Sequence, residues 1–564
     1  MNPPSPGLPP AVPLAAESGL AGALSRRRFL RNTALGAAGL LLSPAALESC
    51  APGTAGASIP GQLRGAGHAT GHLLRHPGRL PAPSRTVRTE VLIVGGGVSG
   101  LSARRWLHRH GQHQVLLVEL EETLGGNAAA GRNEVSAYPW GAHYLPIPDV
   151  RNRELLDFLA EAGVITGFSP AGLPVYNEYY LCHDPEERLH IHGHWQQGLV
   201  PTLGVPPADQ QQIARFLALA ETMRHARGTD GRDAFAIPLD HSSADPAFRR
   251  LDALSFADYL AGEGFTSPYL RWYLDYCCRD DYGAPAGRVS AWAGLHYFAG
   301  RKGRAHNAQA ADVLTWPEGN HFLTQHLRQA APDGIWPHTL AYALRETAAG
   351  VEVLTYDART QQTTRVLARQ VLLATPHFVT RRLLAAALPE LPALQPYQAP
   401  WLIANLTVAG LPQGPGMPLC WDNVQFGSAS LGYINANHQQ VEQQPGAKVI
   451  TLYWPLSEQE PDQARRQAYE TPYETWLARI LAELEKAHPG VAPHVQRAEL
   501  WVWGHGMVAP TPGYLWHPAR AAAARPRNGR LFFAHTDLSG VSIFEEGFYQ
   551  GIRAAEEILH ASRA

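Results

Sequence analysis

The clearest chemical signature in the sequence is a glycine-rich loop, Gly95-x-Gly97-x-x-Gly100, with Val98 and Ser99 inside it. Glycines at this spacing permit a tight turn, close approach of the backbone to a pyrophosphate, and close packing of a helix on a strand. The helix that follows such a loop presents free N–H groups and the positive end of its dipole to phosphates. The loop therefore predicts a dinucleotide-binding site.

The elements around the loop support the same site. The β-branched run 91–94 predicts a buried strand, and residues 98–110 predict a helix that stops at Gly111. A second apolar run, 115–118, ends at Glu119, whose carboxylate can accept hydrogen bonds from an adenosine ribose and disfavours a 2′-phosphate. The alternative interpretation is a glycine-rich turn in an unrelated α/β protein.

Two later segments bear on the choice between NAD and FAD, which the loop alone leaves open. Leu124-Gly125-Gly126-Asn127 follows the acid, and Trp140-Gly141-Ala142-His143-Tyr144 comes next. Together they resemble the FAD-binding region of the flavin amine oxidase and phytoene desaturase superfamily, where a Gly-Gly turn and a later glycine segment line the cofactor. The resemblance implies cofactor contacts at Gly125, Gly126, Asn127, Gly141, Ala142 and His143. Asn127 is a departure, since many amine oxidases carry arginine there.

The resemblance spans residues 88–559 and returns to the cofactor near the C-terminus. The apolar strand 531–534 leads to Asp537, which the superfamily implies as a ligand of the flavin ribityl chain. A glycine-opened helix follows, and its start at Glu546 and Gly547 is implied to face the isoalloxazine. A helix N-terminus there suits the negative charge that develops on a reduced flavin.

The resemblance also implies the fold and its boundaries. In the segment 339–344 it implies a backbone contact of Ala341 with adenine. We expect an α/β fold, with a Rossmann-like FAD-binding domain on a discontinuous parallel sheet and an interleaved α+β substrate domain. The expected FAD-binding pieces are 85–150, 301–387 and 518–564, and the expected substrate pieces are 151–300 and 388–517.

The candidates for the substrate side are four side chains: His505, Phe544, Tyr514 and Asn405. His505 lies between two glycines, could approach the flavin closely and is expected to titrate near neutral pH; a structural histidine in a turn is the alternative. Phe544, three residues before Gly547, takes the place of an aromatic residue, usually tyrosine, that flanks the substrate nitrogen in amine oxidases. Tyr514 is a further candidate, with a core position as its alternative.

The expected central strand, 400–408, lacks a lysine. Many amine oxidases place one there, bonded through water to flavin N5, and it assists reaction with oxygen. Asn405 is the most plausible polar substitute. The absence weakens the case for amines as substrates and for O₂ as acceptor, and favours a desaturase-like dehydrogenase.

Other classes of site are disfavoured. The chain of 564 residues has 47 basic and 49 acidic side chains, which argues against a basic nucleic-acid-binding surface. His190, His192 and His194 alternate and would share a strand face, but Gly193 at a hairpin turn would spoil that face, so no metal site is predicted. The acidic pair Asp280-Asp281 is interpreted as the end of a helix and not as a catalytic pair.

The first 84 residues predict export. Residues 25–31, Ser-Arg-Arg-Arg-Phe-Leu-Arg, and the apolar stretch 33–47 resemble a twin-arginine (Tat) signal, which implies the Tat translocase as a partner and a periplasmic location. Residues 1–50 form the expected signal peptide, and its end resembles a lipobox with Glu48 as a departure. A lipid anchor at Cys50 is therefore left open. Residues 51–84 are predicted to be a flexible linker.

The expected function is that of an FAD-dependent oxidoreductase resembling amine oxidases, which transfers a hydride from a C–H bond of a small-molecule substrate to flavin N5. One alternative is a carotenoid- or porphyrinogen-type desaturase acting on an apolar alkene precursor, which a wide apolar tunnel would favour. Another is an exported flavin-binding protein without catalysis. The electron acceptor is left open between O₂, a quinone and others.

Overall fold

A computed structural model describes residues 59–385, 394–440 and 446–563 of the chain. The predicted twin-arginine signal and Cys50 lie outside the described residues. Within the described part, no helix combines the length and the apolar character that crossing a membrane requires.

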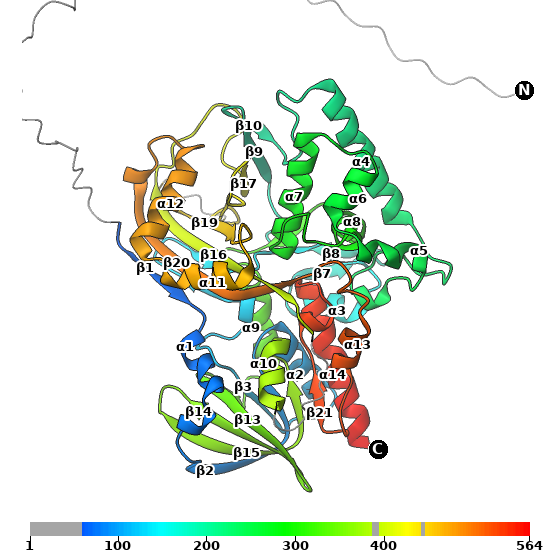
Figure 1. The fold of residues 1–564 in the computed structure, drawn as a ribbon, viewed down its shortest axis with the longest axis vertical. Coiled ribbons are helices and arrows are strands. Elements are labelled where there is room, and N and C mark those ends of the chain that lie inside the picture. The colour runs from blue at the N-terminus through cyan, green and yellow to red at the C-terminus, as the bar shows by residue number, and fades with distance from the viewer. Residues whose placement is uncertain (1–58, 386–393, 441–445, 564) are drawn as a thin grey trace, which may run out of the picture. The chain divides into compact units, whose positions relative to one another are not determined.

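A seven-stranded sheet carries the glycine loop (Figure 1). Its order is β12-β3-β2-β15-β14-β13, with β21 also paired to β15. These strands are β2 (Arg85–Val94), β3 (Val115–Val118), β12 (Ile335–Trp336), β13 (Thr339–Thr347), β14 (Gly350–Asp357), β15 (Gln362–Leu373) and β21 (Leu531–Phe533). Strands β12, β3, β2, β15 and β21 run parallel, while β15, β14 and β13 form an antiparallel meander. The expected α/β fold with a discontinuous Rossmann-like sheet is confirmed.

Both faces of this sheet are covered, which explains why β2 ends in an unbroken apolar run. Val91 and Ile93 pack toward α2 (Val98–Arg109) and α14 (Phe544–Arg563), whereas Leu92 and Val94 pack toward the opposite face. The two helices touch closely because Gly551 has no side chain. A Cβ there would lie 2.1 Å from Ser102 Oγ and 2.3 Å from the Ser99 carbonyl oxygen.

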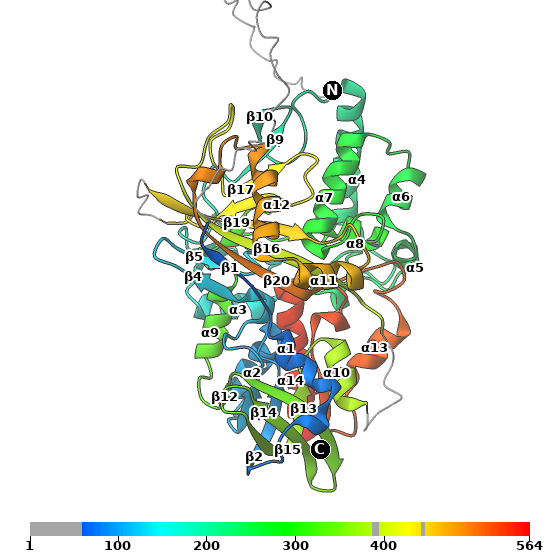
Figure 2. The same ribbon diagram turned by 60° about the vertical axis from the view of Figure 1, so that its left-hand side comes forward.

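An eight-stranded sheet forms the second layer, in the order β1-β20-β16-β19-β18-β17-β9-β10 (Figure 2). Its strands are β1 (Gly61–Gly65), β9 (Glu187–Ile191), β10 (His194–Gln197), β16 (Tyr397–Ala409), β17 (Asp422–Gln425), β18 (Tyr433–Asn435), β19 (Ala447–Pro455) and β20 (Val495–Ala509). The long strand β16 pairs antiparallel with both β19 and β20. The two sheets therefore draw on alternating stretches of the chain.

Helices complete the described fold. Around the seven-stranded sheet lie α3 (Arg153–Glu161), α9 (His321–Gln329), α10 (His377–Leu384) and α13 (Pro518–Ala524). A helical cluster with its own apolar core contains α4 (Pro207–His225), α6 (Phe256–Gly262), α7 (Pro268–Tyr282) and α8 (Ala291–Ala299). Helices α11 (Pro461–Glu470) and α12 (Tyr473–Glu485) pack on the eight-stranded sheet.

The flexible linker predicted for 51–84 is wrong for its described part, residues 59–84. Strand β1 pairs in parallel with β20, and the short helix α1 (His68–Gly71) and two 3-10 turns follow it. Glycine enables this pairing, because a Cβ on Gly61 would lie 1.7 Å from the Ala498 carbonyl oxygen. The glycines that suggested a flexible linker instead permit close contact between β1 and β20.

The histidine-rich segment forms the hairpin of β9 and β10. His192, with φ 51°, and Gly193, with φ 79°, make its turn. Among the described residues, no group of three or more His, Cys, Asp or Glu side chains is arranged to hold a metal ion.

Candidate active site

At each of the three motif positions in the loop, a different feature of the geometry favours glycine. Gly95 has φ +109°, and a Cβ there would lie 2.5 Å from the Ala374 carbonyl oxygen. A Cβ on Gly100 would lie 1.9 Å from the Gly95 carbonyl oxygen, so only glycine lets α2 begin this close to the strand. A Cβ on Gly97 would meet no protein atom within 4 Å, because this residue faces a cavity. No side chain caps α2 at Gly97, which leaves its N-terminus available to a ligand.

Glu119 is fixed beside the loop. Its carboxylate accepts hydrogen bonds from the backbone N–H of Gly96 (2.5 Å) and of Glu121 (2.9 Å). Burial raises the pKa of Glu119, although these backbone hydrogen bonds act in the opposite direction. The acid therefore lies at the cavity wall with its orientation set by the main chain.

A cavity of about 630 Å³ extends from the glycine loop to the eight-stranded sheet. Its volume lies in the range typical of small-molecule and cofactor sites. Of the residues predicted to bind cofactor, those that line it are Gly95, Gly97, Val98, Ser99, Glu119, Gly125, Gly126, Asn127, Ala142, Ala341 and Gly547. Gly100 lies behind the wall and acts through the packing of α2. We refer to this space as the large cavity.

The Gly-Gly turn lies directly against the glycine loop. The Gly125 N–H donates to the Gly96 carbonyl oxygen at 2.9 Å, and both Gly125 and Gly126 have positive φ. The Asn127 amide donates to the Gly506 carbonyl oxygen on β20, which ties this turn to the second sheet. Gly141 has to be glycine, since its Cβ would lie 2.3 Å from the Asn127 carbonyl oxygen.

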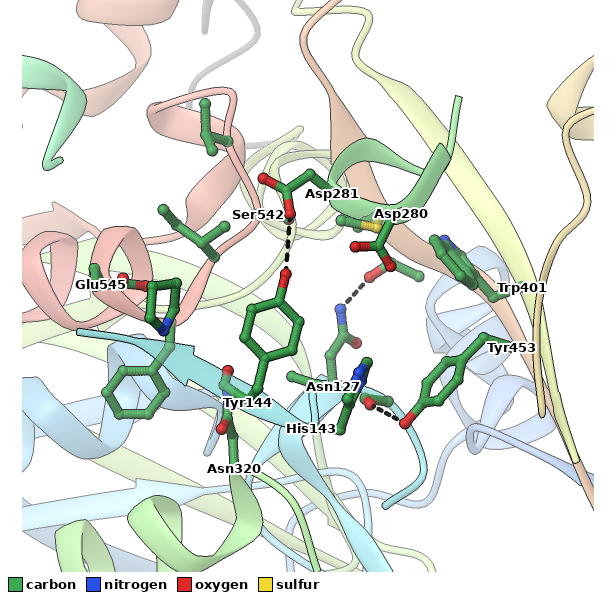
Figure 3. A pocket seen from close by; sticks show the side chains of 18 of the residues that line it. Asn127, His143, Tyr144, Asp280, Asp281, Asn320, Trp401, Tyr453, Ser542 and Glu545 are labelled. Atoms are coloured by element: carbon green, nitrogen blue, oxygen red, sulfur yellow. Dashed lines mark hydrogen bonds between the residues drawn. The ribbon is translucent and has the colours of Figure 1, made fainter. Parts of the chain in front are cut away.

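A smaller cavity of about 150 Å³, which we call the chamber, adjoins the large cavity (Figure 3). Asn127, Met507, Ser542 and Phe544 are among the residues that line both spaces. Aromatic side chains form much of the chamber wall: His143, Tyr144, Tyr297, Trp401, Tyr453, Trp503 and Phe544. The predicted cofactor residues Gly141 and His143 line the chamber and not the large cavity.

The aromatic wall is held by local contacts. The His143 ring lies 4.5 Å from the Tyr453 ring, and the Tyr453 hydroxyl donates to the Gly141 carbonyl oxygen at 3.0 Å. Burial lowers the pKa of His143 to about 4, so this imidazole is neutral at physiological pH. His143 therefore contributes a flat, uncharged surface.

Three carboxyl groups line the chamber. Among the described residues, one arginine lines it as well. Asp280 and Asp281 come from the C-terminal end of α7, Glu545 comes from the first turn of α14, and Arg301 is the cation. Arg301 donates to Asp281 at 2.7 Å and to the Tyr144 hydroxyl at 3.1 Å. Figure 3 shows the Tyr144 hydroxyl directed at Asp281, its acceptor at 3.4 Å.

The Asp280 carboxylate accepts no hydrogen bond from any residue that the structure describes, although it faces the chamber. Burial, and secondarily the neighbouring Asp281, raise the pKa of Asp280 to about 7. Burial likewise raises the pKa of Glu545 to about 7. The chamber thus holds more acid than base, and two of its acids are poised to titrate near neutral pH.

Comparison with known proteins agrees with this architecture. Residues 93–162 match the family of NAD(P)-binding Rossmann-like domains. Putrescine oxidase, in a structure bound to putrescine, is 17% identical with a TM-score of 0.60, covering 84% of this chain and 100% of its own. The chain has the fold of putrescine oxidase. No curated protein sequence matches the chain.

Two further solved structures share the fold. Cyclohexylamine oxidase from Brevibacterium oxydans IH-35A is 17% identical, with a TM-score of 0.56, covering 84% of this chain and 100% of its own. A protein from Exiguobacterium sp. 255-15 assigned as a protoporphyrinogen oxidase is 17% identical, with a TM-score of 0.57, covering 85% of this chain and 99% of its own. The putrescine oxidase fold thus extends over most of the present chain.

Two of the four catalytic candidates lie away from both cavities. Asn405 accepts a hydrogen bond from Thr451 Oγ1 at 2.6 Å and donates to the Pro139 carbonyl oxygen at 3.1 Å, so its amide is occupied within the protein. On the same strand, Trp401 and Ile403 face the chamber instead. Tyr514 is buried, and its hydroxyl donates to the Asp537 carbonyl oxygen at 2.9 Å, which fits its alternative interpretation as a core residue.

His505 and Phe544 do lie at the cavities. Phe544 lines both, at the start of α14, and stacks on Phe548 with ring centroids 6.1 Å apart. His505 lines the large cavity, with its ring 4.4 Å from Phe378. The expectation that His505 titrates near neutral pH is wrong, because burial and then Arg465 lower its pKa to about 4.

Asp537 is placed behind the wall of the large cavity, while His535 and Thr536 of the same turn line it. Its carboxylate accepts hydrogen bonds from the His377 N–H (2.7 Å) and from Gln398 (3.0 Å). Burial alone would raise the pKa of Asp537, but His535 and these donors hold it below its usual value. The carboxylate thus holds the turn in place and does not itself line the large cavity.

Glu546 is also buried and lines neither cavity. One oxygen accepts a hydrogen bond from the Leu239 N–H, while Oε2 has no partner among the described residues. Burial raises its pKa to about 8 from an ordinary 4.5. A carboxyl group whose pKa is raised by folding stabilises the protein below pH 4.5, and that contribution is lost as pH rises toward 8.

We therefore expect Glu546→Gln to be more stable than the wild type by about 2 kcal/mol at roughly pH 8, with the difference shrinking toward pH 5. Urea denaturation at several pH values measures this effect. Glu263→Gln, at an exposed position, serves as the control for the substitution itself. A Glu546→Gln variant equally destabilised at both pH values would contradict the buried, uncompensated charge.

Proposed function

We propose that this chain is an FAD-dependent oxidoreductase that oxidises a small amine. The observation that carries the proposal is the junction of two cavities. A space shaped by a dinucleotide-type glycine loop adjoins a small aromatic chamber with three carboxyl groups and one arginine. Such a chamber has room for a short substrate and favours a positive charge.

The residues of the large cavity fit FAD. Gly97 and Ser99 at the start of α2 would hold the pyrophosphate, and Glu119 would hold the adenosine ribose. Ser542, just before α14, and Gly547, in its first turn, would face the flavin ring system. Bound FAD supplies the capacity to accept a hydride equivalent and to pass two electrons to a second substrate.

The chamber favours an amine over an apolar polyene. Trp401 and Tyr453 present aromatic faces, which attract cations, and Asp280 is an acid without a protein partner. A polyene would gain nothing from these carboxyl groups and would exceed a volume of about 150 Å³. The shared fold with oxidases named for putrescine and cyclohexylamine supports the same substrate class.

The chain's own residues then have separate tasks. The aromatic walls orient the substrate and exclude water, which strengthens electrostatic interactions in the chamber. Asp280 in its carboxylate form accepts a proton from the substrate ammonium, leaving a neutral nitrogen with a free electron pair. That pair assists departure of a hydride equivalent from the adjacent carbon, so the substrate loses two electrons and becomes an iminium ion. Arg301 orients Asp281 through its hydrogen bond and partly offsets the rise that burial causes in the pKa of Asp281.

We further propose export through the twin-arginine pathway to the periplasm, with membrane anchoring through Cys50 as one form of the mature protein. The residue pattern of 25–50 supports this proposal. A pathway for folded cargo suits a protein that loads its cofactor before leaving the cytoplasm.

The test begins with the visible spectrum of the purified protein, where we expect the bands of bound flavin. Anaerobic addition of short monoamines and diamines should bleach these bands, whereas polyenes and porphyrinogens should not. A protein that stays colourless after reconstitution with FAD would overturn the cofactor. Bleaching by polyenes or porphyrinogens alone would support the desaturase alternative, and bleaching only by dithionite would indicate a binding protein without this activity.

A further inference from the structure

We propose that residues 59–79, here called the strap, form an outer wall of the large cavity and retain the bound cofactor by slowing its release. The inference rests on the proposed binding of FAD. It assigns a cofactor-binding role to a segment whose composition predicts only a linker. Figures 1 and 2 show this blue segment running from β1 at the eight-stranded sheet to the seven-stranded sheet.

One end of the strap is fastened to the eight-stranded sheet. Strand β1 pairs with β20 from Gly61 opposite Ala498 to Gly65 opposite Val502. The Tyr473 hydroxyl donates to the Ile59 carbonyl oxygen at 3.1 Å, and the His68 ring lies 4.3 Å from the Tyr469 ring. These contacts hold the segment on β20 and on helices α11 and α12.

The other end is fastened to the nucleotide-binding side. The Gly67 N–H donates to the Glu121 carboxylate at 2.5 Å, two residues after the acid expected to bind ribose. Arg382 on α10 donates to the Leu74 carbonyl oxygen at 3.4 Å, and the Leu74 side chain packs against the apolar core beneath the seven-stranded sheet. The strap therefore bridges elements on both sides of the large cavity.

Between its two ends the strap faces the large cavity itself. His68, His72, Leu74 and Arg75 line it, and Arg75 Nη2 lies 3.1 Å from His72 Nε2. Arg75 brings positive charge to a space proposed to hold a ligand with two phosphates, where charge-assisted hydrogen bonds are favourable. A cofactor bound there cannot leave on this side unless the strap is displaced. Opening of the strap is then a step in release, and the dissociation rate should depend on it.

Gly61 provides a test that leaves the cavity wall itself unchanged, because this residue lines neither cavity. A Cβ at Gly61 would lie 1.7 Å from a backbone oxygen of β20, so Gly61→Val should push β1 off its partner strand. The matched control is Gly78→Val, since a Cβ at the exposed Gly78 would meet no atom within 4 Å. Both variants are made in the full-length, FAD-loaded protein.

Two readouts are measured on each variant: hydrogen exchange of the peptide covering 61–75, and release of FAD followed by the rise in flavin fluorescence after dilution. For Gly61→Val we expect faster exchange in this peptide and about tenfold faster release. Gly78→Val should match the wild type in both. If Gly61→Val leaves the exchange unchanged, the double variant Gly61→Val/Gly65→Val is measured, because a Cβ at Gly65 would lie 3.1 Å from the Val502 carbonyl oxygen.

A loosened strap with unchanged FAD release would overturn this inference and leave the proposed function intact. A wild-type protein that binds no FAD after reconstitution would overturn the proposed function, and the strap inference with it. Faster release that accompanies faster exchange in 61–75 alone supports the strap as a retaining element.

Discussion

Gly97→Val is expected to weaken FAD binding strongly while leaving the protein folded. Gly97 has φ −73°, which valine adopts readily, and a Cβ there would meet no protein atom within 4 Å. The added side chain would instead occupy the large cavity at the N-terminus of α2, where a pyrophosphate is proposed to bind. We expect affinity for FAD to fall by at least about 100-fold, or about 2.7 kcal/mol. Equilibrium titration of the apoprotein, followed by flavin fluorescence, measures this loss.

Variants of two other glycines distinguish an effect on FAD binding from an effect on folding. Gly100→Val should destabilise the apoprotein itself, since its Cβ would lie 1.9 Å from a backbone oxygen that cannot move away. Gly167→Val should behave as the wild type, because its Cβ would meet no atom within 4 Å and the residue lines neither cavity. Wild-type FAD affinity in Gly97→Val would show that the cofactor binds elsewhere. Loss of the thermal unfolding transition in the Gly97→Val apoprotein would contradict the conclusion that there is space for a side chain at Gly97.

The glycine loop could be predicted from the sequence because its geometry is encoded locally. A strand, a turn and a helix within residues 85–109 fix where Gly95, Gly97 and Gly100 lie relative to one another. The spacing of these glycines then reports backbone contacts directly. The same reasoning reaches Glu119, because the next parallel strand of a βαβ unit ends at the same edge of the sheet.

The residues on the substrate side could not be predicted in the same way, because strand register decides which side chains line the chamber. Along β16, Trp401 and Ile403 line the chamber. Asn405 lies on the same face of the strand but outside the chamber, where it accepts a hydrogen bond from Thr451. No local pattern states where along a strand a cavity ends. Asp537 shows a related difficulty, since its acceptors are satisfied by Gln398 and the His377 N–H, which come from distant elements.

The acidic chamber was also hidden in the sequence. Asp280 and Asp281 do lie at a helix end, as interpreted, but their approach to Tyr144, Arg301 and Glu545 depends on how α7 packs against α8 and the eight-stranded sheet. A lone acidic pair after an amphipathic helix most often faces solvent. The only local hint is that the pair is followed by an apolar stretch and not by the polar residues of an exposed turn.

Asp280→Asn is the second variant with a large expected effect, and it addresses catalysis. An amide keeps the shape of the side chain but can neither accept a proton from an ammonium group nor balance its charge. We expect kcat/KM for the amine substrate to fall by about 100-fold, or about 2.7 kcal/mol of transition-state stabilisation. Steady-state kinetics with the best amine from the bleaching screen measures this loss. FAD content should be unchanged, because Asp280 does not line the large cavity.

The pH dependence of Asp280→Asn distinguishes a proton-accepting role from a structural one. Because burial and Asp281 raise the pKa of Asp280 to about 7, its carboxylate form accumulates as pH rises through 7, and wild-type kcat/KM should rise over the same interval. Asp280→Asn should lose that rise, whereas Glu545→Gln, which removes a chamber acid with a similar pKa of about 7, should keep it. A raised pKa also means that Asp280 costs stability above pH 7, so the Asn variant should unfold no more easily than the wild type at pH 8. An inactive variant that is also less stable there would mark Asp280 as structural, and an unchanged pH profile would assign the proton transfer to another group.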